Sequence, residues 1–198
     1  SIIKKHFSDL EKNQTEFIPG KSSIPLAIPP YGWEEVSDAI DSLLEMKTTM
    51  SKKVQKFEKL FAKYLGVKYA IMVNSGSSAN LLAMSILSNS SLSKAKIKKN
   101  DEIITPAVTW ATTVYPILNV GAKPVFVDVG LKDYTIDPEK IEKAITKKTK
   151  AIFLVHLLGN PCNMSKIKKI ADKYNLLIIE DACEAHGAEF KNKKVGSF

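Results

Sequence analysis

The sequence predicts an α/β fold in which helices cover both faces of a mostly parallel sheet. From residue 69 onward, short apolar runs alternate with stretches of helical spacing, which is typical of parallel strands joined by helical crossovers. The chain has 198 residues, of which 44% are apolar and 25% charged, so it can bury a sizeable core. These two observations together favour a three-layer αβα arrangement.

The residues before the first predicted strand carry helical patterns only. Residues 1–28 are expected to be irregular with one short helix, and residues 29–32 to form a turn. Residues 33–46 follow with apolar side chains at helical spacing. Ser51 is expected to cap the next helix, and Gly66 to end it.

The rest of the chain is expected to alternate strands and helices. The predicted strands are residues 69–73, 102–104, 124–127, 151–155 and 176–180. The predicted helices between them are residues 77–87, 109–120, 137–145 and 164–174. Asp137 is the expected cap of its helix, with Pro138 at the first helical position. Residues 188–190 and 194–195 are expected to form a small hairpin around Asn192.

Composition narrows the function classes. The net charge of +8 comes entirely from lysines without a single arginine, and the lysines are spread as pairs over predicted helices, so nucleic-acid binding is not expected. Cys162 and Cys183 are too few for a disulfide framework and form no metal-binding motif. No membrane span or signal sequence is indicated, and a reducing cytoplasmic location is expected.

Polar segments follow four of the predicted strands. They are residues 74–80, residues 105–110, His156 with residues 159–161, and residues 181–187. The carboxyl ends of parallel strands meet at one edge of a sheet, where α/β proteins bind their ligands. We therefore expect the functional site at this edge.

Three features of these segments have both a structural and a functional interpretation. Ser77 and Ser78 open a helix and either cap it or bind a phosphate there. Trp110 is either a core residue or a platform for a planar ligand. Asp181 ends a buried strand, where it caps, forms a salt bridge or pairs with a protonated ring nitrogen. The three functional interpretations together describe pyridoxal 5′-phosphate (PLP).

Several ordered motifs resemble the DegT/DnrJ/EryC1/StrS family of PLP-dependent sugar aminotransferases, which have the type I transferase fold. The resemblance extends from about Tyr31 to Phe198. The motifs are KFE at residues 56–58, YLG at 64–66, NSGSSAN at 74–80, DEIITPA at 101–107, PVFVDV at 124–129, TKAI at 149–152, EDACEAHGA at 180–188 and VGSF at 195–198.

The resemblance implies a role for each matching residue. Ser77 and Ser78 match the positions that hold the cofactor phosphate, and Trp110 matches the aromatic residue that stacks on the ring. Asp181 matches the partner of the ring nitrogen, and Glu184 lies where the family usually has Gln or His near the ring hydroxyl. Asp181 and Glu184 are accordingly the expected catalytic residues.

Two further positions have a weaker place in the resemblance. His156 is expected to approach the ring hydroxyl and is included among the cofactor-binding residues, although a structural hydrogen bond is the alternative. Cys183 lies beside the ring position. Residues 106–116 and 157–161, with an acid at position 184, are most similar to the branch of GDP-4-keto-6-deoxymannose 3-dehydratase.

The resemblance implies the N-terminal part of the large domain of such an enzyme. Residues 1–50 are expected to be an arm with a helix and residues 51–198 a truncated cofactor-binding domain, without the C-terminal domain. The Schiff-base position of the family lies beyond Phe198. An aminotransferase acting on a nucleotide-linked keto-deoxysugar in surface polysaccharide biosynthesis, such as lipopolysaccharide synthesis, is the implied function. A nucleotide-sugar 3-dehydratase and a non-catalytic cofactor-binding module are the alternatives.

The resemblance also implies partners. The expected cofactor is PLP, and the expected substrates are a nucleotide sugar and an amino donor, glutamate by family habit. A homodimer is expected because family members share residues between two active sites.

Overall fold

The computed structural model describes residues 1–12, 17–24, 30–91 and 97–198. The chain divides into two units, Ser1–Phe57 and Glu58–Phe198, and each is described by itself. The expected domain boundary after residue 50 stays a prediction.

The first unit is helical. It contains α1 (Ile2–Lys12), α2 (Trp33–Leu44) and the first turns of α3 (Lys52–Leu65). At the start of α2, the Glu35 carboxylate accepts the amide of Gly32 at 2.7 Å, which satisfies an amide that the helix leaves free. The helix ends two residues before the predicted residue 46. The predicted turn at residues 29–32 lies partly outside the described residues.

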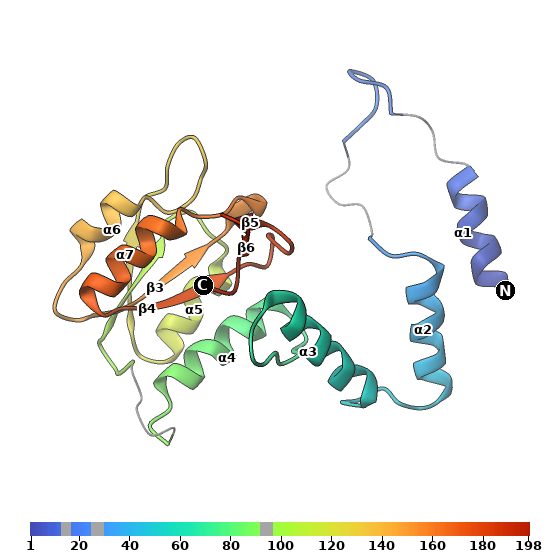
Figure 1. Cartoon of the computed structure of the whole chain (residues 1–198), viewed down its shortest axis with the longest axis horizontal. Coiled ribbons are helices and arrows are strands. Elements are labelled where there is room, and N and C mark those ends of the chain that lie inside the picture. The colour runs from blue at the N-terminus through green and yellow to red at the C-terminus, as the bar shows by residue number, and fades with distance from the viewer. Residues whose placement is uncertain (13–16, 25–29, 92–96) are drawn as a thin grey trace. The chain divides into compact units, whose positions relative to one another are not determined.

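The second unit contains the rest of α3 and the α/β layers. Its other helices are α4 (Gly76–Ser88), α5 (Ala111–Asn119), α6 (Pro138–Ala144), the 3-10 helix η1 (Leu157–Gly159) and α7 (Met164–Tyr174). Its strands are β1 (Glu102–Pro106), β2 (Lys123–Val127), β3 (Thr149–Val155), β4 (Leu177–Asp181), β5 (Glu189–Phe190) and β6 (Lys193–Lys194). The first four strands form one parallel sheet in the order β2-β1-β3-β4 (Figure 1).

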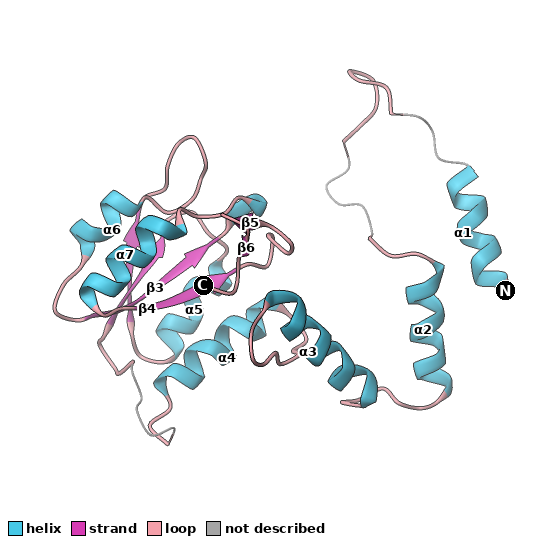
Figure 2. Ribbon diagram, in the orientation of Figure 1, coloured by secondary structure: helices cyan, strands magenta, loops and turns pink. Residues whose placement is uncertain are grey.

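The sheet lies between two helical layers, so the predicted αβα fold is confirmed. Helices α6 and α7 cover one face, and α4 and α5 cover the other (Figure 2). On the α6/α7 side, Ile104 and Leu154 pack against Ile141 and Ile167. On the α4/α5 side the core contains Ile103, Phe153, Met84 and Ile117. Strands β1, β3 and β4 therefore contribute side chains to both cores, because successive side chains alternate between faces, whereas β2 contributes to the α6/α7 side.

Most predicted elements of this unit are confirmed to within a few residues. Helix α7 has the predicted bounds, and Asp137 caps α6 with its carboxylate on the amide of Glu139. The predicted hairpin forms as β5 and β6, with Lys191 and Asn192 both at positive φ in the turn. The cap of α4 is Ser75, so that helix starts one residue before the predicted position.

The predicted strand at residues 69–73 is wrong. These residues are irregular, and Tyr69 and Ile71 are 74% and 62% exposed. The amide of Met72 donates to the Glu58 carboxylate at 2.9 Å, in place of a ladder bond. A strand needs a neighbour to pair with, and no strand of the described residues lies beside this segment. The segment has the apolar pattern of a strand, but no strand within the described residues pairs with it.

No helix within the described residues combines the length and the apolar composition needed to cross a bilayer.

Candidate functional site

Asp181 is the centre of the candidate site. It ends β4 at the carboxyl edge of the sheet and is 6% exposed. Its Oδ2 atom accepts from Nδ2 of Asn80 at 2.7 Å and from the hydroxyl of Thr113 at 2.9 Å. Its Oδ1 atom accepts the backbone amide of Cys183, at 3.2 Å. The carboxylate is thus held at one oxygen by two side chains, and the other oxygen keeps acceptor capacity.

These hydrogen bonds bring two helix starts to Asp181. Asn80 belongs to the first turns of α4, which carries Ser77 and Ser78, and Thr113 belongs to the first turn of α5, which Trp110 precedes. The structure therefore brings the predicted phosphate-binding and stacking segments to the strand-end carboxylate.

The start of α4 has the features of an anion site. Ser75 caps the helix by accepting the amide of Ser78 at 3.2 Å. The amides of Gly76 and Ser77 find no acceptor among the described residues. Together with the exposed hydroxyl of Ser77, they offer donors at the positive end of the helix dipole.

Trp110 is not a core residue. It is 76% exposed at the N-cap position of α5, and its carbonyl accepts the amide of Thr113 at 3.0 Å. This largely exposed indole precedes the helix whose Thr113 contacts Asp181, and it is available as a platform for a planar ligand.

Glu184 is exposed and restrains a loop. Its Oε2 atom accepts the amide of Leu158 at 2.6 Å, and Leu158 has the left-handed φ of 56° that side chains disfavour. Gly159 follows at φ 80°, where an added Cβ would lie 3.3 Å from the carbonyl oxygen of Glu184. Glu184 therefore fixes η1, and its second carboxylate oxygen has no hydrogen bond to the described residues.

His156 lies on the opposite face of the sheet from Asp181. Its side chain is 0% exposed, and its Nδ1 atom accepts the amide of Cys162 at 3.0 Å. A backbone amide can only donate, so the ring proton is on Nε2, which donates to Glu180 at 3.1 Å. Both ring nitrogens are thus engaged. The expected cofactor contact of His156 does not fit this geometry, whereas the structural alternative does.

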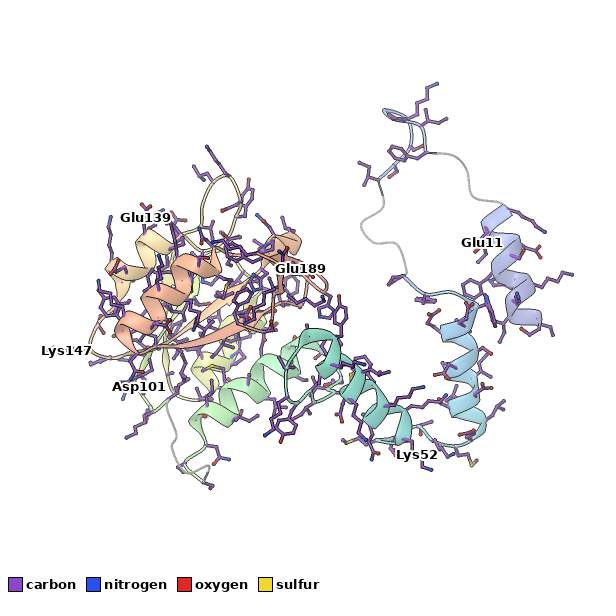
Figure 3. The ribbon with its side chains drawn as sticks, viewed as in Figure 1. Glu11, Lys52, Asp101, Glu139, Lys147 and Glu189 are labelled. Atoms are coloured by element: carbon purple, nitrogen blue, oxygen red, sulfur yellow. The ribbon has the colours of Figure 1, made fainter. Side chains whose placement is uncertain are left out.

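A cavity of about 330 Å³ adjoins Asp181. Its lining includes Gly76 and Asn80 from α4, Cys183 and Gly196, but not Trp110 or Ser77. Burial, with a further contribution from the Asp181 carboxylate, raises the pKa of the Cys183 thiol to about 12. A larger groove lies at the amino ends of the strands, near the Asp101 and Lys147 labelled in Figure 3, and is remote from these groups.

The sequence did not indicate which residues hold Asp181. Asn80 and Thr113 are separated from it by 101 and 68 positions. Both lie three residues after a residue that was singled out, Ser77 or Trp110, and this helical spacing was an available signal. Glu180 was also unassigned, although strand alternation places it on the face opposite to Asp181.

The parallel sheet, its helical layers and the strand-end carboxylate define a cofactor-binding α/β domain of the type I PLP-dependent transferases. Residues 31–198 match the DegT/DnrJ/EryC1/StrS aminotransferase family, and the chain belongs to it. PLP is the cofactor of this family.

Named relatives support this membership. The chain is 45% identical over 168 residues to GDP-4-keto-6-deoxy-D-mannose 3-dehydratase of Escherichia coli O55:H7, covering 84% of this chain and 43% of that protein. It is 41% identical over 182 residues to the lipopolysaccharide biosynthesis protein RfbH of Salmonella typhimurium LT2, covering 92% and 42%.

A solved structure is similar in fold. The E. coli GDP-4-keto-6-deoxy-D-mannose-3-dehydratase with bound hydrated PLP has a TM-score of 0.83 and 44% identity, covering 89% of this chain and 45% of that one. The chain thus spans less than half the length of the relatives that it matches.

The described residues fit PLP. The Oδ1 atom of Asp181 has acceptor capacity for a ring N–H, because the Cys183 amide uses one of its two lone pairs. The free amides of Gly76 and Ser77 suit a phosphate, and the exposed indole of Trp110 suits a flat ring. The site thus offers a carboxylate for the ring nitrogen of this cofactor, amide donors for its phosphate and an aromatic surface for its ring.

Proposed function

We propose that this chain is part of a PLP-dependent aminotransferase that acts on a nucleotide-linked keto-deoxysugar in surface polysaccharide biosynthesis. The observation that carries the proposal is the buried Asp181 carboxylate, held by donors from α4 and α5 with one oxygen left for a ring nitrogen. Membership in an aminotransferase family and similarity to a lipopolysaccharide biosynthesis protein support it.

Each residue of the site has a proposed task. When bound, the cofactor supplies an electron sink for the carbon from which a proton is removed. Asp181 holds the proton on the ring nitrogen through its Oδ1 atom. Ser77, Ser78 and the first amides of α4 bind the phosphate. Trp110 fixes the plane of the ring, which determines the bond that lies across it.

Glu184 is proposed as the second catalytic residue. Among the described residues, the amide of Leu158 is the one hydrogen-bond partner of its carboxylate, at Oε2. Its other oxygen is free to hold or move a proton near the ring hydroxyl.

The partners and the setting are further parts of the proposal. The substrates are a nucleotide sugar and an amino donor, which we propose to be glutamate. The enzyme is a cytoplasmic homodimer, with residues 1–50 as an arm and residues 51–198 as part of the cofactor-binding domain.

A second candidate function is a nucleotide-sugar 3-dehydratase with the same cofactor. The acidic residue at position 184 and the 45% identity to a 3-dehydratase favour it. The two candidates share the roles of Asp181, Ser77 and Trp110. They differ in whether the chain, joined to its remaining domains, transfers an amino group or removes a sugar hydroxyl.

Binding of pyridoxamine 5′-phosphate tests the shared half of the proposal. This probe has the ring nitrogen and the phosphate of PLP but no aldehyde, so the many lysines cannot capture it covalently. Its fluorescence is titrated with the chain as it is, and with Asp181→Asn and Ser77→Ala. We expect binding by the unaltered chain and a loss of at least about tenfold in affinity for Asp181→Asn, because the charged partner of the ring proton is removed.

Two controls locate the effect. Asp172→Asn removes an exposed carboxylate of α7 and should leave affinity unchanged. Pyridoxamine, which lacks the phosphate, should bind the unaltered chain and Ser77→Ala equally. Equal affinity of the phosphorylated probe for the unaltered chain, Asp181→Asn and Ser77→Ala would overturn the assignment of this site.

A further inference from the structure

We propose that Glu180 and His156 form a positioning pair that fixes residues 195–198, of which Val195 and Gly196 form one wall of the cavity beside Asp181. The inference goes beyond the proposed function, because it concerns how the wall of the site is held and assigns a role to two buried groups that the chemistry does not use.

Glu180 has a buried carboxylate that accepts hydrogen bonds from two backbone amides. Its side chain is 6% exposed. Its Oε2 atom accepts the amide of Gly196 at 2.7 Å, and its Oε1 atom accepts the amide of Phe198 at 2.7 Å. Short bonds from amides to a charged acceptor are stronger than bonds between neutral groups. In Figure 1 the C-terminus accordingly lies beside the end of β4.

His156 also binds the Glu180 carboxylate. Its Nε2 atom donates to the same oxygen that accepts Gly196, at 3.1 Å. Its Nδ1 atom is fixed by the Cys162 amide, so the ring can neither rotate nor exchange its tautomer without losing a buried bond. The pair therefore has a single arrangement in which both carboxylate oxygens face residues 195–198.

The first two residues of the segment that this pair holds, Val195 and Gly196, line the cavity of the candidate site. Gly196 lines the cavity together with Asp181 and Cys183, and Val195 is 3% exposed. Gly196 has a φ of 84°, and a Cβ there would lie 3.7 Å from the Cβ of Ala182, the residue after Asp181. Two adjacent residues of β4 therefore have different roles. Glu180 binds the backbone of the wall, and Asp181 lines the cavity.

Amide hydrogen exchange distinguishes a positioning pair from an ordinary buried ion pair. Glu180→Gln keeps the size of the side chain but presents an NH₂ group to one of the two amides. We expect exchange at Gly196 and Phe198 to become at least tenfold faster, while amides of β3 keep their rates. Nuclear magnetic resonance of the His156 ring should show the proton on Nε2 in the unaltered chain.

Glu189→Gln is the matched control. Glu189, labelled in Figure 3, is on the β5–β6 hairpin that directly precedes residues 195–198. It pairs with Lys194 at 3.0 Å, and no hydrogen bond joins it to Gly196 or Phe198. It should leave the exchange rates of both amides unchanged. Unchanged rates in Glu180→Gln, uniformly faster exchange over the whole sheet, equal effects of the two variants, or a ring proton on Nδ1 would each overturn the proposal.

A second pair of variants keeps the test decisive if Glu180→Gln does not fold. His156→Gln retains a donor and an acceptor, and His156→Ala removes both. Faster exchange at Gly196 in His156→Ala, with recovery in His156→Gln, supports the positioning role. Equal rates in the two variants would contradict it.

Ligand binding connects the pair to the proposed function. Affinity for pyridoxamine 5′-phosphate should fall in Glu180→Gln by several-fold and remain unchanged in Glu189→Gln. An unchanged affinity in Glu180→Gln would show that the wall does not serve the ligand and overturn that part of the inference. If the unaltered chain does not bind the probe, the proposed function fails, while the exchange rates still decide the role of Glu180.

Discussion

Thr113→Val should destabilise the protein through the loss of one hydrogen bond to the buried carboxylate of Asp181. Thr113 is 1% exposed, and its hydroxyl donates to Asp181 Oδ2 at 2.9 Å while accepting from Thr109 at 3.1 Å. Valine has nearly the same shape as threonine, so the substitution opens no cavity. The change therefore isolates the hydroxyl group.

The size of the effect follows from the contacts that remain. A hydrogen bond to a charged group contributes about 1.5–3 kcal/mol. Asn80 still donates to the same oxygen at 2.7 Å, so the carboxylate is weakened and not orphaned. We expect the free energy of unfolding to fall by about 2 kcal/mol, which corresponds to a decrease of about 4–8 °C in Tm for a domain of this size.

Thr105→Val is a control with the opposite expected sign. Thr105 lies on β1, on the same face as Ile103, and is 0% exposed. Its hydroxyl finds no hydrogen-bond partner among the described residues. Removing a buried, unpaired hydroxyl should raise the free energy of unfolding by about 1 kcal/mol.

Urea unfolding of both variants, followed by far-ultraviolet circular dichroism, measures the two effects. The slope with denaturant should be the same in both variants, so that only the midpoint moves. Equal losses in Thr113→Val and Thr105→Val would refute the reasoning, because the hydrogen bond to Asp181 would then contribute nothing beyond the general cost of altering a buried threonine.

Three other measurements test further details. Burial raises the pKa of Cys162 to about 12, above its unfolded value of about 9, so its stabilising contribution is complete below pH 9 and lost as pH rises toward 12. Cys162→Ala should flatten this alkaline decline in unfolding titrations. Cys183 is exposed, but with a pKa of about 12 it should react with iodoacetamide at pH 8 on the order of a hundredfold or more slowly than a free thiol. Asp181→Asn should speed that reaction, and an unchanged rate would contradict the assigned cause. Asn192→Gly places glycine at a φ of 62° and should raise the midpoint of thermal unfolding, with a stabilisation of about 0.5 kcal/mol.

Local signals explain how much of the fold the sequence could predict. Helix α7 begins after an Asn cap and ends at a left-handed Asn175, and both boundaries lie within the local pattern. The segment at residues 69–73 has an equally clear apolar pattern but forms no strand. Strand formation depends on a partner elsewhere in the chain, so the pattern alone was insufficient.

The site was predictable in its residue types and less so in its contacts. Asp181, Ser77 and Trp110 are predicted because each follows a run of residues with a strand pattern. The structure brings their segments together, although the run before Ser77 forms no strand. The donors that fix Asp181 come from distant positions and are not encoded in any local motif. His156 was expected at the cofactor, whereas strand alternation, applied to β3, would have placed it on the other face.

The pairing of β4 with β3 decides which of two adjacent acids serves the site. Glu180 is opposite Leu154, whose side chain is in the α6/α7 core, so Asp181 must face α4 and α5. The side-chain lengths suit these faces: the short Asp181 is reached by the amide of Asn80, and the longer Glu180 extends to the backbone of Gly196. Exchanging the two acids would conserve composition and charge, yet each carboxylate would then miss its donors by the length of one methylene group. The order of the two residues, and not only their presence at a strand end, is therefore what both the site and its wall require.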